Sequence, residues 1–333
     1  ILDLSGFDTS EVINMDSMFS GCTNLTTLDI SGFDTKNVTK MNSMFRGCKS
    51  LTSLDLSDFD TSKVTGMNSM FHDCSGLTSL DVSGFETGEV TDMGIMFRGC
   101  SKLTSLDVSG FDTGKVTSMS NMFNNCPSLT AITGLSDLET SKVTDMSYMF
   151  NGCKKLTSLD LSKWDVSKVE SMNSAFCECS SITELNLSGF TNVKDWGSFC
   201  RKCTNLVSIT GLDTSKYSTN FGGNVNNFLS FQDCASLRNI KDINVSFTSV
   251  MATSNNKTIN DEYWILSAWG WFRDLTNLVD ITFTGQVELY DTMSTYTILR
   301  GCDTTKFTNE TWNTFMSIFP TTSESKSIVM GRS

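Results

Sequence analysis

The stretch TKMNSMFRGCKSLTSLDLSDFDTSKVTGMNSMFHDC, from Thr39 to Cys74, contains nearly the same sequence twice. The motif M-N-S-M-F-x-x-C ends at Cys48 and again 26 residues later at Cys74. The same cysteine recurs along the chain at Cys22, Cys48, Cys74, Cys100, Cys126, Cys153, Cys179, Cys203 and Cys234. A period of this length indicates an array of stacked units rather than several globular domains.

The first half of each repeat has the spacing of a short strand. In one copy the apolar residues are Leu51, Leu54 and Leu56, an L-x-x-L-x-L pattern. Alternation at its end places every second side chain on the same face. We therefore expect one short strand per repeat with one buried face, and a parallel sheet where the repeats stack.

The second half of each repeat has helical spacing. Its apolar residues are three, three and one positions apart: Val64, Met67, Met70 and Phe71. This spacing predicts a short helix with one apolar stripe. The segment 60–62 precedes the stripe and supplies side-chain oxygens suited to a helix N-cap.

The repeated string LTSLDLSGFDTSKV-T-x-M-x-x-MF-x-x-C resembles the leucine-rich repeat, and more specifically the BspA-like leucine-rich-repeat surface proteins of bacteria. The resemblance covers nine or so repeats from Ile1 to about Ile243. It implies a secreted or surface-displayed binding protein, with adhesion as the usual role. The implied partners are proteins or glycans on a host or neighbouring cell.

The predicted fold is an α/β leucine-rich-repeat solenoid with a parallel concave sheet and short convex helices. We expect regular repeats over 1–243, an irregular insertion over 244–270, degenerate repeats over 271–302 and a helix–strand cap over 303–333, all within one solenoid. A parallel β-helix enzyme is the less favoured fold, because its coils use short strands where this chain has the helix-spaced M-x-x-M-F segment.

The charge balance disfavours two classes of partner. The chain carries 25 Lys and Arg against 37 Asp and Glu, a net charge of −12. Nucleic acids and anionic membranes both favour clustered cations.

No apolar run approaches the roughly 20 residues that cross a bilayer. Because Ile1 enters in the middle of a repeat, we expect an N-terminal cap and any signal peptide to lie before it.

The repeat cysteines are predicted to be buried, reduced thiols. Equivalent residues on neighbouring coils lie about 4.8 Å apart with parallel Cβ bonds, whereas disulfides need closer, converging ones. The extra residues Cys177 and Cys200 follow a repeat phenylalanine and are predicted to occupy one equivalent place. A zinc site formed with Cys179 and Cys203, or a Cys177–Cys200 disulfide, is the alternative.

No enzyme activity and no cofactor are expected. His72 is the single histidine, and most hydrolytic schemes need a histidine beside a nucleophile and an orienting carboxylate. The sequence contains no phosphate-binding P-loop and no dinucleotide-binding glycine motif. Two-carboxylate chemistry stays open, since the chain is rich in carboxylates.

An acidic column is the first candidate binding surface. It occupies one outward position of the predicted strands: Asp29, Asp55, Asp81, Asp107 and Asp160. Such a column could simply keep the surface soluble. It could also dock a cationic protein patch, or hold calcium between neighbouring carboxylates.

Two tryptophans form the second candidate. Trp264 and Trp269 lie in the insertion, where the repeat assigns them no place in the core, and exposed aromatics on loops are common binding anchors. Trp164 and Trp196 replace repeat core residues and are expected to be buried. The predicted function is therefore surface recognition centred on the irregular C-terminal third. A structural spacer or stalk, including a phage virion component, is the alternative.

Overall fold

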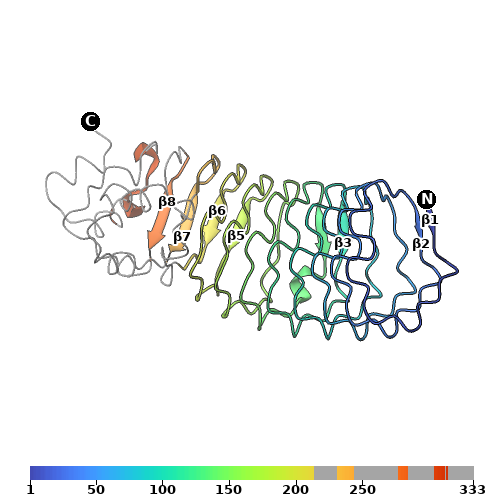
Figure 1. Ribbon diagram of the computed structural model, residues 1–333. Coiled ribbons are helices and arrows are strands. Elements are labelled where there is room, and N and C mark those ends of the chain that lie inside the picture. Colours follow the sequence, from blue (N-terminus) through green and yellow to red (C-terminus); the bar gives the residue numbers. More distant parts are fainter. Residues whose placement is uncertain (214–230, 244–276, 284–303, 312, 314–333) are drawn as a thin grey trace, which may run out of the picture. The chain divides into compact units, whose positions relative to one another are not determined.

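In the computed structural model the chain folds into two compact units, Ile1–Lys168 and Val169–Ser333. Figure 1 labels strands of both units along the sequence. The structure describes residues 1–213, 231–243, 277–283, 304–311 and 313. Trp264, Trp269 and the insertion over 244–270 lie outside these residues. The prediction of one continuous solenoid stays a prediction.

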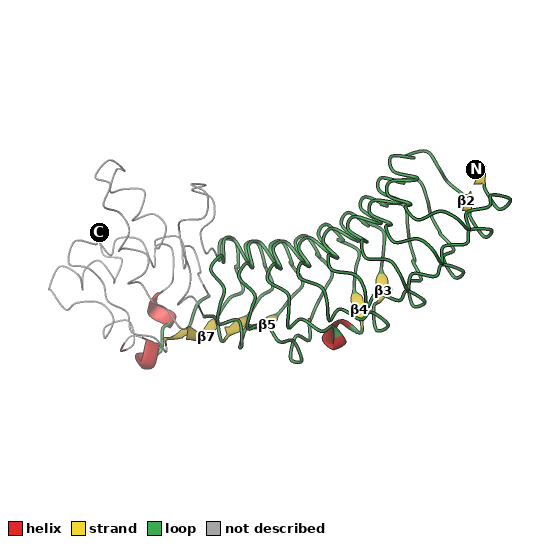
Figure 2. Cartoon of the chain, turned by 60° about the horizontal axis from the view of Figure 1, so that its bottom comes forward, coloured by secondary structure: helices red, strands yellow, loops and turns green. Residues whose placement is uncertain are grey.

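Short parallel strands recur at the predicted positions, and those of each unit lie on one side of its coils (Figure 2). In the first unit they are β1 (Leu2–Asp3), β2 (Leu28–Asp29), β3 (Ser105–Asp107) and β4 (Ala131–Thr133). In the second they are β5 (Glu184–Asn186), β6 (Ser208–Thr210), β7 (Asn239–Ile243) and β8 (Asp280–Phe283). β1 pairs with β2, β3 with β4, and β5 to β8 form one sheet in sequence order. The parallel pairing is confirmed. The prediction of one strand in every repeat is wrong, because the segments 51–56, 77–82 and 156–161 form no strand.

The predicted short helices are absent from the regular repeats over residues 1–213, so the prediction of convex helices is wrong for this part of the chain. The residues of the M-x-x-M-F segment form turns, and Ser69 has a left-handed φ of 60°. Met70 donates its N–H to Met67 O at 3.2 Å, while Phe71 donates to Met96 O of the next coil at 2.9 Å. Alternating N–H groups thus bond locally and to the neighbouring coil, and an α-helix cannot form.

These bonds join the coils of the first unit along a second side. Isolated parallel bridges run through Asn14, Lys40, Gly66, Asp92, Ser118 and Asp145. The apolar stripe that suggested a helix is nevertheless buried, with Met67, Met70 and Phe71 all 0% exposed. The helical spacing predicted the buried side chains correctly but the backbone conformation incorrectly. A turn that is hydrogen-bonded to the next coil buries the same side chains as the expected helix would.

A column of stacked phenylalanine rings fills the core of the first unit. Successive centroids are 5.6–5.8 Å apart with interplanar angles of 5–10°, through Phe19, Phe45, Phe71, Phe97, Phe123 and Phe150. Such distances lie within the range of favourable aromatic pairs. One ring per coil therefore packs against the same ring of each neighbour.

A buried hydroxyl column runs along the turn after each strand. Thr61 is 1% exposed, its Oγ1 donates to Glu86 O at 3.0 Å, and it accepts from Glu86 N at 2.7 Å. Equivalent threonines are Thr9, Thr35, Thr87, Thr113 and Thr140. The predicted helix-capping role of segment 60–62 is wrong: Thr61 joins coils, and Asp60 accepts from Ser62 N at 3.0 Å in a local turn.

One coil of the first unit departs from the repeat. The interval from Cys126 to Cys153 is 27 residues, and it contains the 3₁₀ turn η1 (Leu135–Asp137). Gly134 precedes this turn with a φ of 77°, and a Cβ there would lie 2.3 Å from Ser109 Cα. Only glycine fits this position.

Part of the predicted cap lies within the described residues. It contains the 3₁₀ turn η2 (Thr304–Lys306) followed by the first turn of a helix. Thr308 Oγ1 accepts a hydrogen bond from Thr311 N at 3.1 Å, which is an N-cap arrangement. Thr311 Oγ1 in turn donates to Asp280 Oδ1 at 2.8 Å and ties this turn to β8.

Candidate recognition surfaces

The aspartates of the acidic column are exposed, and the backbone fixes each of them. Asp55 Oδ1 accepts from Ser57 N at 3.0 Å, and Asp81 Oδ1 accepts from both Ser83 N at 3.0 Å and Ser83 Oγ at 2.7 Å. The same bond from the residue two positions later occurs at Asp29, Asp107 and Asp160. These hydrogen bonds hold the pKa of Asp55, Asp81, Asp107 and Asp160 below the usual value.

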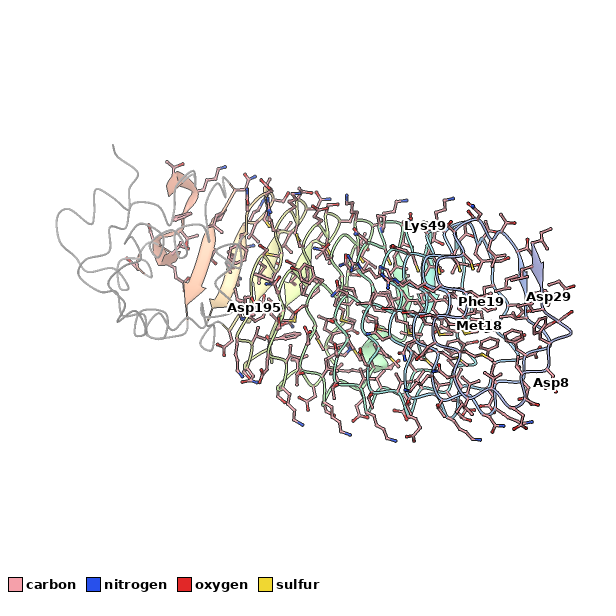
Figure 3. The ribbon with its side chains drawn as sticks, viewed as in Figure 1. Asp8, Met18, Phe19, Asp29, Lys49 and Asp195 are labelled. Carbon is pink, nitrogen blue, oxygen red and sulfur yellow. The ribbon has the colours of Figure 1, made fainter. Side chains whose placement is uncertain are left out.

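A second acidic column, which the sequence reasoning did not single out, lies at the F-D-T-S turn. Figure 3 shows Asp8 and Asp29, one from each column, at separate places on the first coils. Each carboxylate of this second column accepts a hydrogen bond from the backbone N–H of the residue two positions later. The members of the column are Asp8, Asp34, Asp60, Asp112 and Asp165. Lys36 Nζ lies 2.6 Å from Asp34 Oδ2, so this column is partly neutralised. The recurring D-x-S pattern was the available signal.

Among the described residues no group of three His, Cys, Asp or Glu side chains is arranged to hold an ion. Calcium on the acidic column stays a proposal, as does the zinc alternative for the cysteines.

The repeat cysteines within the described residues form no disulfide, and most of their thiols donate a hydrogen bond to a backbone carbonyl. Cys74 Sγ lies 3.0 Å from Phe45 O, and Cys48 Sγ lies 3.2 Å from Phe19 O. Burial raises the pKa of Cys48 to about 11 and also raises that of Cys74. A protonated thiol is a weak nucleophile, so these two cysteines are packing groups, and the prediction of buried thiols without disulfides is confirmed for them.

Two repeat cysteines differ from this pattern. Cys22 is only half-buried, so the prediction of burial is wrong for it. Hydrogen bonds with the Cys200 and Cys203 thiols lower the pKa of Cys234 to about 5.

The two extra cysteines do not occupy equivalent places, which corrects the sequence-based expectation. Cys200 is three residues before Cys203, the position of the repeat phenylalanine, and it is 0% exposed. Cys177 is two residues before Cys179 and is half-buried. Trp196 and Phe199 fill the space beside the small Cys200 side chain, with ring centroids 5.3 Å apart. Counting from the repeat cysteine, rather than from the nearest phenylalanine, would have found this offset.

The replacement tryptophans belong to the core, as predicted. Trp164 is 8% exposed and donates from Nε1 to Leu135 O at 2.8 Å. Trp196 is 0% exposed and donates from Nε1 to Asp213 O at 2.9 Å. The candidate anchors Trp264 and Trp269 fall outside the described residues, so they stay predictions.

The histidine has no catalytic arrangement in the described chain. His72 is half-buried, and its Nε2 lies 3.6 Å from Asp73 Oδ1. Burial lowers its pKa; Asp73 opposes this effect, while Arg46 and Arg98 add to it. Among the residues that the structure describes, no helix has both the length and the apolar character that a membrane span requires.

Residues 2–106 and 95–211 match the family described as "Mycoplasma protein of unknown function, DUF285". The chain belongs to the DUF285 family. Two successive matches over a repeating segment agree with the coil architecture, and they confirm the predicted resemblance at the level of the repeat. No curated protein matches this DUF285 chain.

Solved structures similar to this DUF285 protein are also repeat proteins. A leucine-rich repeat protein from Bacteroides ovatus is 16% identical over 82% of this chain and 78% of its own, with a TM-score of 0.36. A leucine rich cell surface protein from Faecalibacterium prausnitzii is 16% identical over 70% and 77%, with a TM-score of 0.26. An internalin from Listeria monocytogenes is 14% identical over 80% of each chain, with a TM-score of 0.22.

Proposed function

We propose that this protein is a non-enzymatic recognition scaffold that is displayed at a cell surface or secreted and binds a protein or glycan partner. The observation that carries the proposal is the pair of sides along the first unit: parallel bridges join the M-x-x-M-F turns of its successive coils on one side, and β1–β2 and β3–β4 pair on the other. Because inter-coil bonds fix these sides, exposed side chains are held in rows before a partner arrives. A surface ordered in advance loses less conformational entropy on binding.

The insertion tryptophans are the proposed anchors. A glycan array and a pull-down with host-surface proteins, both using the whole chain, would identify a partner. Trp264→Ala or Trp269→Ala should then weaken binding by about 2 kcal/mol or more, with unchanged thermal stability. Phe7→Ala is the matched control, since Phe7 is 59% exposed on a regular coil. Full binding by the double tryptophan variant would refute this placement.

The acidic column is the second proposed contact surface. Changing Asp55, Asp81 and Asp107 together to Asn retains an oxygen that accepts the hydrogen bond from the serine two positions later. If the column binds a cationic patch or calcium, this variant should bind more weakly and with a flatter salt dependence. Equal binding and equal salt dependence would remove the column from the site.

A structural spacer or stalk, in a cell envelope or a virion, is the second candidate function. The near identity of the coils before Cys153 favours it, because a spacer needs only a fixed length per coil. Normal binding by both sets of variants would make the spacer the better description.

A further inference from the structure

One coil of the second unit lacks the phenylalanine of the repeat. We call the third residue before each repeat cysteine the ring position. Before the repeat cysteines from Cys22 to Cys234 it is phenylalanine in all coils but one: Phe19, Phe45, Phe71, Phe97, Phe123, Phe150, Phe176 and Phe231. In the remaining coil Cys200 occupies the ring position, before Cys203. Cys200 is buried like the rings, and its thiol brings a chemistry that they lack.

In most coils the repeat thiol lies against the ring position of the preceding coil. Cys126 Sγ lies 3.1 Å from Phe97 O, and Cys203 Sγ lies 3.0 Å from Phe176 O. Cys234 Sγ makes the same contact with Cys200 O, at 3.1 Å. The contact that elsewhere joins a thiol to a phenylalanine therefore brings two cysteines together here.

Three buried thiols meet where these two coils pack. Cys200, Cys203 and Cys234 are each fully buried, and the first two donate their thiol hydrogens to the Cys234 sulfur. These hydrogen bonds lower the pKa of Cys234, which is therefore a thiolate at neutral pH. Burial raises the pKa of Cys200, which stays a protonated thiol. A nucleophilic thiolate thus lies beside a thiol.

This arrangement is suited to disulfide formation. The thiolate is the nucleophile of thiol–disulfide exchange, and a second thiol within reach completes the bond. Metal ligation is the other common use of clustered cysteines. In the part of the chain that the structure describes, no three His, Cys, Asp or Glu side chains are arranged to hold an ion, so the geometry favours a disulfide.

Cys200 is better placed than Cys203 to pair with Cys234. Cys203 and Cys234 are both repeat cysteines, and such residues stack on neighbouring coils with parallel Cβ bonds, which disulfides disfavour. Cys200 starts from the ring position, and the Cys234 sulfur already lies against its backbone. These two sulfur atoms therefore approach each other from different positions of their coils.

We propose that Cys200 and Cys234 form a disulfide as the chain folds in an oxidising medium, and that this bond locks their two coils together. The co-reactant is a small-molecule disulfide, which enters before the coils close over the cluster. The Cys234 thiolate attacks one sulfur of the oxidant, forms a mixed disulfide and releases a thiolate. The Cys200 sulfur then attacks Cys234, loses its proton to the medium and displaces the second thiolate. Two protein thiols thus lose two electrons, and one small disulfide is reduced to two thiols.

The bond should stabilise the second unit. Cys200 and Cys234 are 34 positions apart, so the bond restricts a long loop of the unfolded chain. We expect the melting temperature to rise by about 5 °C or more relative to the reduced protein. This inference does not depend on which partner the protein binds.

The test refolds the whole chain in a mixture of oxidised and reduced glutathione, and in a phosphine reductant as the reference. Remaining thiols are blocked with N-ethylmaleimide, and the protein is digested with trypsin without reduction. Trypsin cuts after Arg201 and Lys202, which places Cys200 and Cys203 on different peptides, with Cys234 on a third. Mass spectrometry of linked peptides therefore identifies the pair, and we expect Cys200 linked to Cys234.

Melting curves of matched variants complete the test. Cys200→Ala should lose both the link and the difference in melting temperature between oxidised and reduced protein. Cys203→Ala should retain both. Cys48→Ala, which removes a repeat cysteine of the first unit, should also retain both.

Four results would overturn the inference. The first is the absence of any linked peptide after oxidative refolding. The second is a link that joins Cys203 to Cys234, or Cys177 to Cys200. The third is a Cys200–Cys234 link that leaves the melting temperature unchanged, since the bond would then lock nothing. The fourth is an oxidation-dependent rise in melting temperature that persists in Cys200→Ala.

Discussion

Replacing Thr61 by valine tests the hydroxyl column directly. The two side chains have nearly the same shape, so the change removes one hydroxyl and leaves the packing of this buried site in place. Glu86 of the next coil then loses both a donor to its O and an acceptor for its N. Valine is compatible with the position, because Val166 occupies its equivalent in another coil and is 4% exposed.

The expected loss follows from the two bonds. Each hydrogen bond contributes roughly 1 kcal/mol net, so the variant should be about 2 kcal/mol less stable. If water reaches neither the backbone N–H nor the backbone C=O of Glu86, each group bears most of its desolvation cost. The loss of stability should then approach about 4 kcal/mol. A helix-capping role would predict about 1 kcal/mol, and no dependence on the neighbouring coil.

Urea denaturation of the whole chain measures the effect as a lower midpoint at constant slope. Thr65→Val is the matched control: Thr65 lies in the same coil, is exposed, and donates from Oγ1 to Thr39 O at 3.2 Å. It should change stability by less than about 0.5 kcal/mol. Thr61→Ser, which keeps the hydroxyl, should cost much less than Thr61→Val. Equal losses in the serine and valine variants of Thr61, or no loss in the valine variant, would refute the inter-coil reasoning.

Three further predictions test the core and the turns. Phe71→Ala removes a ring stacked 5.7 Å from both neighbours and should cost about 3–5 kcal/mol in urea denaturation; a loss under about 1 kcal/mol would place the ring outside the core. Burial raises the pKa of Cys48 from 9.0 to about 11, so its contribution to stability is intact below about pH 9 and is lost as the pH rises toward 11; Cys48→Ser should flatten stability-against-pH curves in that window, and parallel curves would contradict the shift. Gly134→Ala should lower stability by more than about 1 kcal/mol, because its φ is 77° and the added Cβ meets Ser109 backbone; an unchanged melting curve would exclude this contact.

The sequence was sufficient to predict which side chains are buried. A 26-residue period requires that equivalent residues stack, and Leu54, Met67 and Phe71 are buried as the apolar pattern indicates. The parallel strands and the unpaired repeat thiols follow from the same stacking. These predictions depend only on periodicity and apolar character, which a single sequence displays fully.

The backbone of the second half could not be predicted in the same way. Helical spacing assumes that N–H groups bond within the segment, whereas Phe71 N bonds to Met96 O in the next coil. The role of Thr61 was wrongly predicted for the same reason, since a polar side chain facing another coil and one facing solvent look alike in sequence. The helix-like spacing of the apolar residues in the M-x-x-M-F segment is therefore not evidence of an α-helix, and it does not count against a parallel β-helix.

The candidate sites were only partly predictable. The outward position of the acidic column follows from strand alternation, but the serine N–H groups that fix it were not anticipated. The departure from the repeat at the left-handed turn position was visible in the sequence, because Ile95, Asn121 and Tyr148 replace a serine of the repeat. Its meaning depends on the left-handed φ, which only the structure supplies.

The uniform inter-coil bonds also affect how the chain folds. Each coil of the first unit presents the same backbone donors and acceptors as its neighbours. During folding, a coil can therefore dock onto the coil two repeats away and leave the repeat between them looped out. Closing such a loop has a modest entropic cost, and the slipped state keeps most native bonds, which makes it a kinetic trap. Gly134 counters this degeneracy, because its coil is one residue longer and its backbone passes too close to Ser109 for any other residue. This longer coil interrupts the regular repeat of the stack and so favours one alignment of its neighbours over the slipped ones.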